Sequence, residues 1–355
     1  MPVVDHQLDQ PVFFLPNRVW RCYTGGLLLD RFLGRDESTD GYMPEEWLAS
    51  ITSAENGEHS LSVEEGLSRL RPGDGQPGPL YRDVAGTERM DVLCKFLDAA
   101  VRLPIQCHPD QAFARAHYGS EHGKTESWLI LDTRTLNGVQ PYLLIGFKPG
   151  ISAAAFTQAV EKQDVAAMEG MLNRIPVSPG DAYLIPGRTP HAIGPGVLML
   201  EVQEPSDWVV QVERRCADTW LSERDMWGPL TPDVAMGCFE YRGETACAVR
   251  KRLAMTPKFI STSSTATHER LEAEVRTEAF RIDRLRLSAR HRFICDRPRH
   301  IGIVTAGSGR MTTGGRSFAL TCGETYFASS CVGEIEFVPD PGAPLTMCVI
   351  ASGSA

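Results

Sequence analysis

Two histidine-containing segments limit the possible folds and functions of this chain more than any other feature of its sequence. In the segment 103–128, Gln106 and His108 lie two residues apart in an extended apolar run, and Glu126 follows a polar connection. Residues two apart on a strand point to the same face of the sheet, so Gln106 and His108 can act together. His191 belongs to the second segment, farther along the chain. We therefore expect a divalent metal site with Gln106, His108, Glu126 and His191 as its ligands.

The residues around His191 predict where its side chain points. Gly180, Pro186 and His191 have the spacing Gly-x5-Pro-x4-His, which resembles the second half-motif of cupin jelly rolls, where the histidine faces into a barrel. Arg188 stands where the strict motif has glycine, and Gly187 comes one residue early. Two histidines, a carboxylate and an amide suit Zn²⁺, or less selectively iron, manganese or nickel. Such a site also leaves room for water or substrate.

The composition is that of an ordinary globular protein with an acidic balance. The chain has 355 residues, of which 42% are hydrophobic and 23% charged, and its formal net charge is −9. This balance argues against nucleic-acid binding, which needs a basic face. No apolar run reaches the roughly 18 residues that predict a membrane span.

The cysteines and the N-terminus indicate the compartment. The ten cysteines include no CxxC pair, and several lie in apolar strand-like runs. The N-terminus lacks the basic and apolar regions of a secretory signal. We therefore expect a cytoplasmic protein with reduced thiols. Cys107 lies between two predicted ligands, so on a strand it would fill the core on the opposite face.

Strand-like runs with Gly and Pro turns dominate the chain and predict a mainly β fold. The segment GDAYLIPGRTPHAI (180–193) is echoed by GETYFASSCVGEIEF (323–337), which indicates two copies of one barrel. The second copy lacks a histidine at the position of His191, so we expect it to be metal-free. We predict a double cupin of jelly-roll barrels. A metal-binding domain with a helical insert covers residues 1–215, a turn-rich connection covers 216–270, and the second barrel covers 271–355.

Helical patterns interrupt the strands in three places. Helix-forming residues dominate the insert at about 152–175, where Asp164 can start a second helix. The segment DQAFARAHYG reads as a short helix capped by Asp110, and Ser62 is a candidate cap for a helix over 62–70.

Taken together, these motifs resemble the class I mannose-6-phosphate isomerases, which are zinc-dependent cupins. The resemblance covers residues 15–215 well and the C-terminal barrel loosely. The combination of Gln-x-His-Pro, Gly-Lys-Thr-Glu and a later His-Ala is highly specific. The segments that carry it are EEWLAS (45–50), KFLDAAVRLPIQCHPD (95–110), GKTESW (123–128), IGFKPGIS (145–152), PGDAYLIPGRTPHAIG (179–194) and LEVQEPSDWVVQ (200–211).

The resemblance implies roles for individual residues. The four predicted ligands would hold zinc, and the reaction would be an aldose–ketose isomerisation through an enediol. The partner would be a small-molecule sugar or sugar phosphate, bound by a monomer or a homodimer. Lys124 and Glu201 would face the sugar, with Glu201 carrying the proton. The pocket around the sugar would also include Trp47, Arg188, Asp207 and Arg214.

Two positions depart from the family pattern. Gln211 stands where the family has an arginine near the reacting carbons or the phosphate, and glutamine supplies no fixed positive charge. Pro104 replaces a serine near the phosphate, and it has neither a hydroxyl nor an N–H. We therefore consider two alternatives: this chain handles a sugar without a phosphate, or Lys148, Arg188 or Arg214 supplies the anion site by another route.

The leading hypothesis is thus a metal-dependent isomerase that converts mannose 6-phosphate to fructose 6-phosphate or acts on a related sugar. One alternative is an isomerase or epimerase of a non-phosphorylated sugar. A metal-dependent lyase or oxygenase would be a further use of the same fold, and firmly bound iron with oxygen uptake would indicate the oxygenase. A non-catalytic sugar sensor is the alternative from another class, and the missing arginine favours it. Sugar binding without turnover would identify the sensor.

Overall fold

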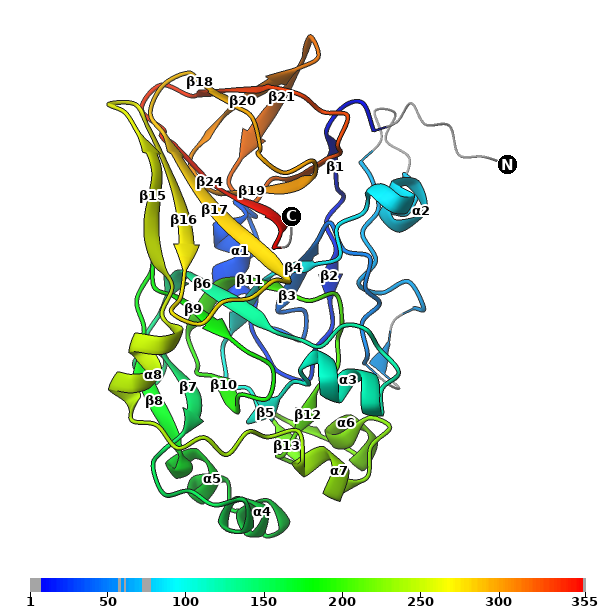
Figure 1. Cartoon of the computed structure of the whole chain (residues 1–355), viewed down its shortest axis with the longest axis vertical. Coiled ribbons are helices and arrows are strands. Elements are labelled where there is room, and N and C mark those ends of the chain that lie inside the picture. Colours follow the sequence, from blue (N-terminus) through cyan, green and yellow to red (C-terminus); the bar gives the residue numbers. More distant parts are fainter. Residues whose placement is uncertain (1–7, 57–58, 61, 72–77, 354–355) are drawn as a thin grey trace.

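The structure is a computed structural model that describes residues 8–56, 59–60, 62–71 and 78–353 (Figure 1). Strands predominate, and all paired strands are antiparallel. The prediction of a mainly β fold with two barrels is confirmed. No described helix is long and apolar enough to cross a membrane. The first seven residues, on which the expectation of no secretory signal partly rests, lie outside the described residues.

Two antiparallel sheets build the first barrel, in the lower half of Figure 1. The six-stranded sheet contains, in spatial order, β2 (Arg18–Val19), β3 (Glu45–Leu48), β4 (Leu93–Ala99), β11 (Val197–Gln203), β6 (Glu126–Thr133) and β9 (Ala182–Ile185). The five-stranded sheet contains β12 (Val210–Gln211), β5 (Gln106–Cys107), β10 (His191–Ile193), β7 (Tyr142–Phe147) and β8 (Leu172–Pro176). One apolar cluster with residues from both sheets, including Trp128 and Ile145, fills the space between them.

The second barrel has the same two-sheet plan. Its seven-stranded sheet contains β1 (Val12–Phe13), β22 (Thr325–Ala328), β19 (His300–Ala306), β24 (Leu345–Ser352), β17 (Phe280–Leu287), β16 (Ala266–Glu272) and β15 (Thr256–Thr262). Its four-stranded sheet contains β18 (His291–Phe293), β23 (Ile335–Pro339), β20 (Ser308–Thr313) and β21 (Arg316–Thr321). A separate apolar cluster lies inside this barrel, and a third cluster joins the six-stranded sheet to the seven-stranded one.

Short helices cover the ends of the barrels and the connections between strands. They are α1 (Leu27–Phe32), α2 (Tyr81–Ala85), η2 (Gly86–Glu88), α3 (Gln111–His117), α4 (Ala153–Glu161), α5 (Val165–Met171), α6 (Glu223–Trp227), α7 (Pro232–Met236) and α8 (Ala246–Leu253). Two predicted caps are confirmed, because the side chain of Asp110 accepts from Phe113 N in α3 and that of Asp164 from Ala167 N in α5. The helical insert expected at about 152–175 corresponds to α4 and α5, but its last four residues belong to strand β8.

Two local expectations differ from the structure. The helix expected over 62–70 is wrong: residues 63–66 form a turn. Gly66 has φ +86°, and a Cβ there would lie 2.6 Å from the Trp47 ring, so the chain must turn sharply against that ring. The stretch 216–270 is also less irregular than expected, because it holds three helices, the hairpin of β13 (Arg215–Cys216) and β14 (Thr219–Trp220), and β15 with part of β16. The division into domains at 215 and 271 remains a prediction.

Candidate active site

Three of the four predicted metal ligands converge inside the first barrel. His108 follows β5, Glu126 begins β6 and His191 begins β10, and each is 1% exposed. Their ligand atoms all lie within 4.8 Å of one another. His108 Nε2 is 3.5 Å from Glu126 Oε2, and His191 Nε2 is 3.3 Å from Glu126 Oε1. Within the described part of the chain, no other group of His, Cys, Asp and Glu side chains is arranged in this way.

Backbone carbonyls orient both imidazole rings. His108 Nδ1 lies 2.8 Å from Trp208 O, and His191 Nδ1 lies 2.8 Å from Thr189 O. A carbonyl oxygen only accepts, so Nδ1 carries the proton and Nε2 of the neutral ring keeps its lone pair. Burial lowers the pKa of His191 to about 4 and lowers that of His108 well below its usual range, with Lys124 adding to the shift of His108. Both rings are therefore neutral near pH 7, as metal ligands must be.

The geometry of these donors fits a divalent metal ion. Both Nε2 atoms are buried and have no hydrogen-bond partner, which is costly unless something binds them. Two ligands that each lie about 2.1 Å from a tetrahedral metal ion are about 3.4 Å apart. The observed separations of 3.3 and 3.5 Å between nitrogen and oxygen match that spacing. We conclude that this is a candidate metal site.

Gln106 lies next to the three converging side chains. The strand register pairs it with His191 on β10 and with Gln211 on β12. Its neighbour Cys107 points away and is buried, with Sγ 3.9 Å from Cys238 Sγ. The prediction that Cys107 fills the core on the opposite face is confirmed.

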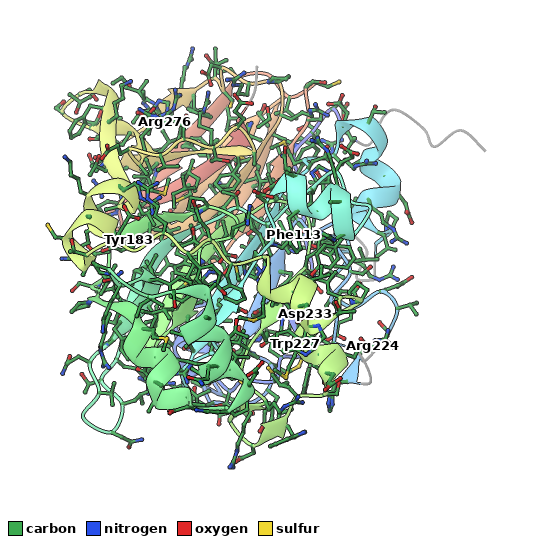
Figure 2. The ribbon with its side chains drawn as sticks, turned by 60° about the horizontal axis from the view of Figure 1, so that its bottom comes forward. Phe113, Tyr183, Arg224, Trp227, Asp233 and Arg276 are labelled. Carbon is green, nitrogen blue, oxygen red and sulfur yellow. The ribbon has the colours of Figure 1, made fainter. Side chains whose placement is uncertain are left out.

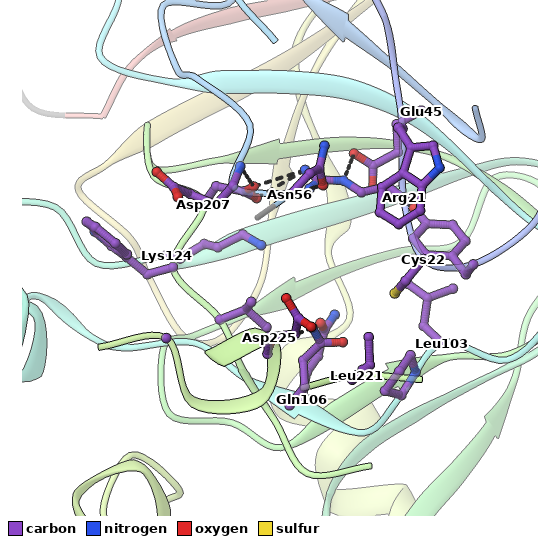
Figure 3. Close-up of a pocket in the computed structure, with 18 of the residues that line it drawn as sticks. Arg21, Cys22, Glu45, Asn56, Leu103, Gln106, Lys124, Asp207, Leu221 and Asp225 are labelled. Atoms are coloured by element: carbon purple, nitrogen blue, oxygen red, sulfur yellow. Dashed lines mark hydrogen bonds and ion pairs between the residues drawn. The ribbon is translucent and has the colours of Figure 1, made fainter. Parts of the chain in front are cut away.

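A cavity of about 520 Å³ adjoins the metal ligands (Figure 3). This volume lies in the usual range for small-molecule sites. The predicted residues that line it are Gln106, Lys124, Glu126, Glu201, Asp207 and Gln211, together with Pro104. Aromatic pairs stand in the wall as well: the rings of Tyr118 and Trp208 are stacked with centroids 4.6 Å apart. A cavity that combines charged and amide groups with aromatic rings suits a sugar-sized ligand.

Comparisons with known proteins agree with this geometry. The chain is 28% identical over 245 residues to a probable mannose-6-phosphate isomerase, GmuF, of Bacillus subtilis, covering 68% of this chain and 70% of the relative. It is also 28% identical over 268 residues to mannose-6-phosphate isomerase of Streptococcus mutans, covering 73% and 76% of the two chains. The chain is mannose-6-phosphate isomerase-like. No protein-family model matches it.

The fold likeness extends along nearly the whole chain. The crystal structure of the mannose 6-phosphate isomerase from Bacillus subtilis superposes with a TM-score of 0.73 at 22% identity. The match covers 96% of this chain and 99% of the other. Both barrels therefore belong to the shared cupin-type fold, including the C-terminal one, where the sequence resemblance is loose.

Glu201 and Lys124 border the cavity beside the metal ligands. Glu201 lies in the middle of β11, where the register places it opposite Lys95 and Trp128. Burial raises the pKa of Glu201 to about 7, and the neighbouring Glu126 adds to the shift. The Nζ of Lys95 lies 3.1 Å from Glu201 Oε1, and the Nζ of Lys124 lies 3.8 Å from Glu126 Oε2. Burial and Lys95 lower the pKa of Lys124.

A charge network within this wall was not predicted from the sequence. Arg21 contacts Glu45 with Nε at 3.0 Å and Asp207 with Nη2 at 3.1 Å, and it donates to Asn56 (Figure 3). Burial opposes its charge, but Asp207 and Glu45 outweigh burial and raise the pKa of Arg21. The one available signal was Lys95, a charge that lies among the apolar residues of β4. Arg21 lies 186 residues from Asp207, and no local motif marks it.

Three predicted pocket residues lie outside the cavity wall. Trp47 is buried beneath it: its Nε1 donates to Glu45 at 2.7 Å, and the Arg21 guanidinium lies 5.0 Å from the ring centroid. Arg188 donates to Cys238 O and Gly237 O, and Arg214 lies 3.3 Å from Glu223. None of the three is among the described residues that line the cavity. Trp47 thus supports the charged wall, while the placement of Arg188 and Arg214 gives their expected contact with the sugar no support.

Proposed function

We propose that this chain is a metal-dependent aldose–ketose isomerase that interconverts mannose 6-phosphate and fructose 6-phosphate or a closely related pair. The observation that carries the proposal is the His108–Glu126–His191 cluster, with two orphaned Nε2 atoms, beside a cavity that also presents Glu201 and Lys124. The similarity to mannose-6-phosphate isomerases indicates the same reaction class.

The donor set favours Zn²⁺ as the metal. Two neutral imidazoles and a carboxylate are common zinc ligands, and Gln106, in register with His191, would add an amide oxygen. A bound Zn²⁺ would polarise the sugar oxygens and stabilise negative charge that develops on them. Lys124 would donate to the same oxygens and add positive charge.

Glu201 would move the proton between the two reacting carbons. In the direction from aldose to ketose, the carboxylate takes the proton from C2 and returns it to C1, while a second proton passes from O2 to O1. Lys95 and the strands around β11 hold this carboxylate in place. The buried setting excludes bulk water, which protects the enediol from exchange with solvent.

The test is turnover of mannose 6-phosphate by metal-analysed protein, compared with a Glu201→Gln variant. We expect about one zinc per chain in both proteins and a fall in kcat of about 10²- to 10⁴-fold in the variant. Retained metal shows that the substitution acts on proton transfer. A wild-type protein that holds its metal and binds the sugar without converting it would instead be a sugar sensor.

A further inference from the structure

The cations that line the cavity differ in what they can bind. Four Lys and Arg side chains among the described residues line it: Arg21, Lys95, Lys124 and Arg224. Lys95 and Lys124 are buried, Arg21 is largely buried, and each of the three faces a carboxylate, with separations of 3.1 Å from Arg21 to Asp207, 3.1 Å from Lys95 to Glu201 and 3.8 Å from Lys124 to Glu126. The charges of Arg21 and Lys95 are therefore compensated inside the protein, and Lys124 is committed to the reacting sugar oxygens in the proposed reaction. Removing such a partner leaves an uncompensated buried charge and is strongly unfavourable.

Arg224 has no such partner. Among the described residues, no carboxylate lies within ion-pair distance of its guanidinium, although the acidic residues Glu223 and Asp225 flank it in the chain. Glu223 faces Arg214 at 3.3 Å, and Asp225 accepts from Ser222 N and Oγ in the capping box of α6. Arg224 is therefore a free cation at the cavity.

The position of Arg224 is well determined by its helix. Met226 and Trp227 in α6 are buried, and Gln211 Nε2 donates to Asp225 O at 3.3 Å, which ties the helix to β12. Figure 2, in which the lower end of the view in Figure 1 is turned forward, labels Arg224 and Trp227 on α6. The helix thus carries a guanidinium to the cavity wall where Gln211 itself offers only a neutral amide.

We propose that Arg224 recognises the phosphate group of the sugar phosphate and sets the preference for phosphorylated over free sugars. This inference rests on the proposed function, because it assumes that the cavity receives the sugar. A guanidinium binds phosphate oxygens through two parallel charge-assisted hydrogen bonds, and a free one breaks no internal pair to do so. The other arginines and lysines considered for this role are occupied elsewhere: Arg188 with backbone carbonyls, Arg214 with Glu223 and Lys148 with Gly170 O.

The experiment measures binding and turnover separately. Calorimetry on the metal-loaded protein with mannitol 6-phosphate, which has no carbonyl and cannot isomerise, reports phosphate recognition alone. We expect Arg224→Ala to weaken this binding at least 10-fold. In turnover, the same variant should lose at least 10-fold in kcat/KM for mannose 6-phosphate while kcat/KM for free mannose changes less than 2-fold.

Arg215→Ala is the matched control, because Arg215 lies in the hairpin that precedes the same helix, faces Asp218 at 3.9 Å and is not among the described residues that line the cavity. It should leave both measurements unchanged. Equal losses for the phosphate ester and the free sugar in Arg224→Ala, or no loss in either, would overturn the inference while leaving an active isomerase. Arg224-dependent binding of mannitol 6-phosphate without turnover of any sugar would support the inference and reject the proposed isomerase.

Discussion

The two barrels share one arrangement of strands, but the first contains a cavity bordered by charged side chains and the second contains a packed apolar core. In each, a Gly-acid-x-Tyr sequence leads into a strand, β9 in the first barrel and β22 in the second. The next strand in the first barrel begins with His191, whereas β23 begins with the buried Ile335. Charged side chains border the cavity of the first barrel, while Phe293, Tyr326 and Phe337 pack inside the second. The same fold therefore carries chemistry or a packed core, depending on a few inward-facing residues.

Substitutions of one buried histidine in each barrel give the largest expected difference between the two barrels. His191 and His300 are both buried, but His191 Nε2 faces Glu126, whereas His300 packs edge-on against Phe293 and Tyr326. We expect His191→Ala to lose the bound metal and all detectable isomerase activity. His300→Gln should keep about one metal per chain and most of its activity. The measurement is metal analysis of protein whose folding has been checked by circular dichroism. Equal metal loss in both variants would contradict the conclusion that only the first barrel binds the metal.

A core truncation in the second barrel tests whether that barrel contributes to stability but not to metal binding. Phe337 is fully buried in the apolar cluster, and Phe337→Ala should lower the free energy of unfolding by about 3–5 kcal/mol. The metal content of the remaining folded protein should not change, because the metal ligands lie in the first barrel. Urea unfolding followed by fluorescence, with metal analysis of the folded fraction, measures both. Stoichiometric metal loss at full folding would show that the barrels are coupled.

The smallest expected effect is a pH dependence from the second barrel. Burial lowers the pKa of His300 to about 4, below the unfolded value of about 6.5. Protonation thus favours the unfolded chain, and stability is lost as pH falls from about 6.5 toward 4. The loss amounts to at most about 3 kcal/mol. Urea unfolding between pH 7 and 4.5 should show a flatter profile for His300→Phe than for wild type; identical profiles would exclude His300 as the source.

Local spacing explains why much of the site could be predicted. Gln106 lies in β5 and His108 directly follows it, and His191 follows a glycine and a proline at fixed intervals, so their directions depend on a few neighbouring torsions. The caps at Asp110 and Asp164 are equally local, because each side chain bonds an amide three residues on. The failed helix over 62–70 had the right apolar spacing, but Trp47 occupies the space beside Gly66 and tertiary packing overrides the local preference.

By itself, the sequence determined the candidate ligands, the mainly β double-barrel plan and the likeness to mannose-6-phosphate isomerases. Only the tertiary structure decided which charges meet across the chain. It joined Arg21 to Asp207, set Lys95 opposite Glu201, brought Arg224 to the cavity and left Arg188 and Arg214 outside it. The physical reason is that the spacing of the metal ligands depends on the backbone geometry of a few neighbouring residues. Buried ion pairs depend instead on how strands that are distant in the sequence close into a barrel.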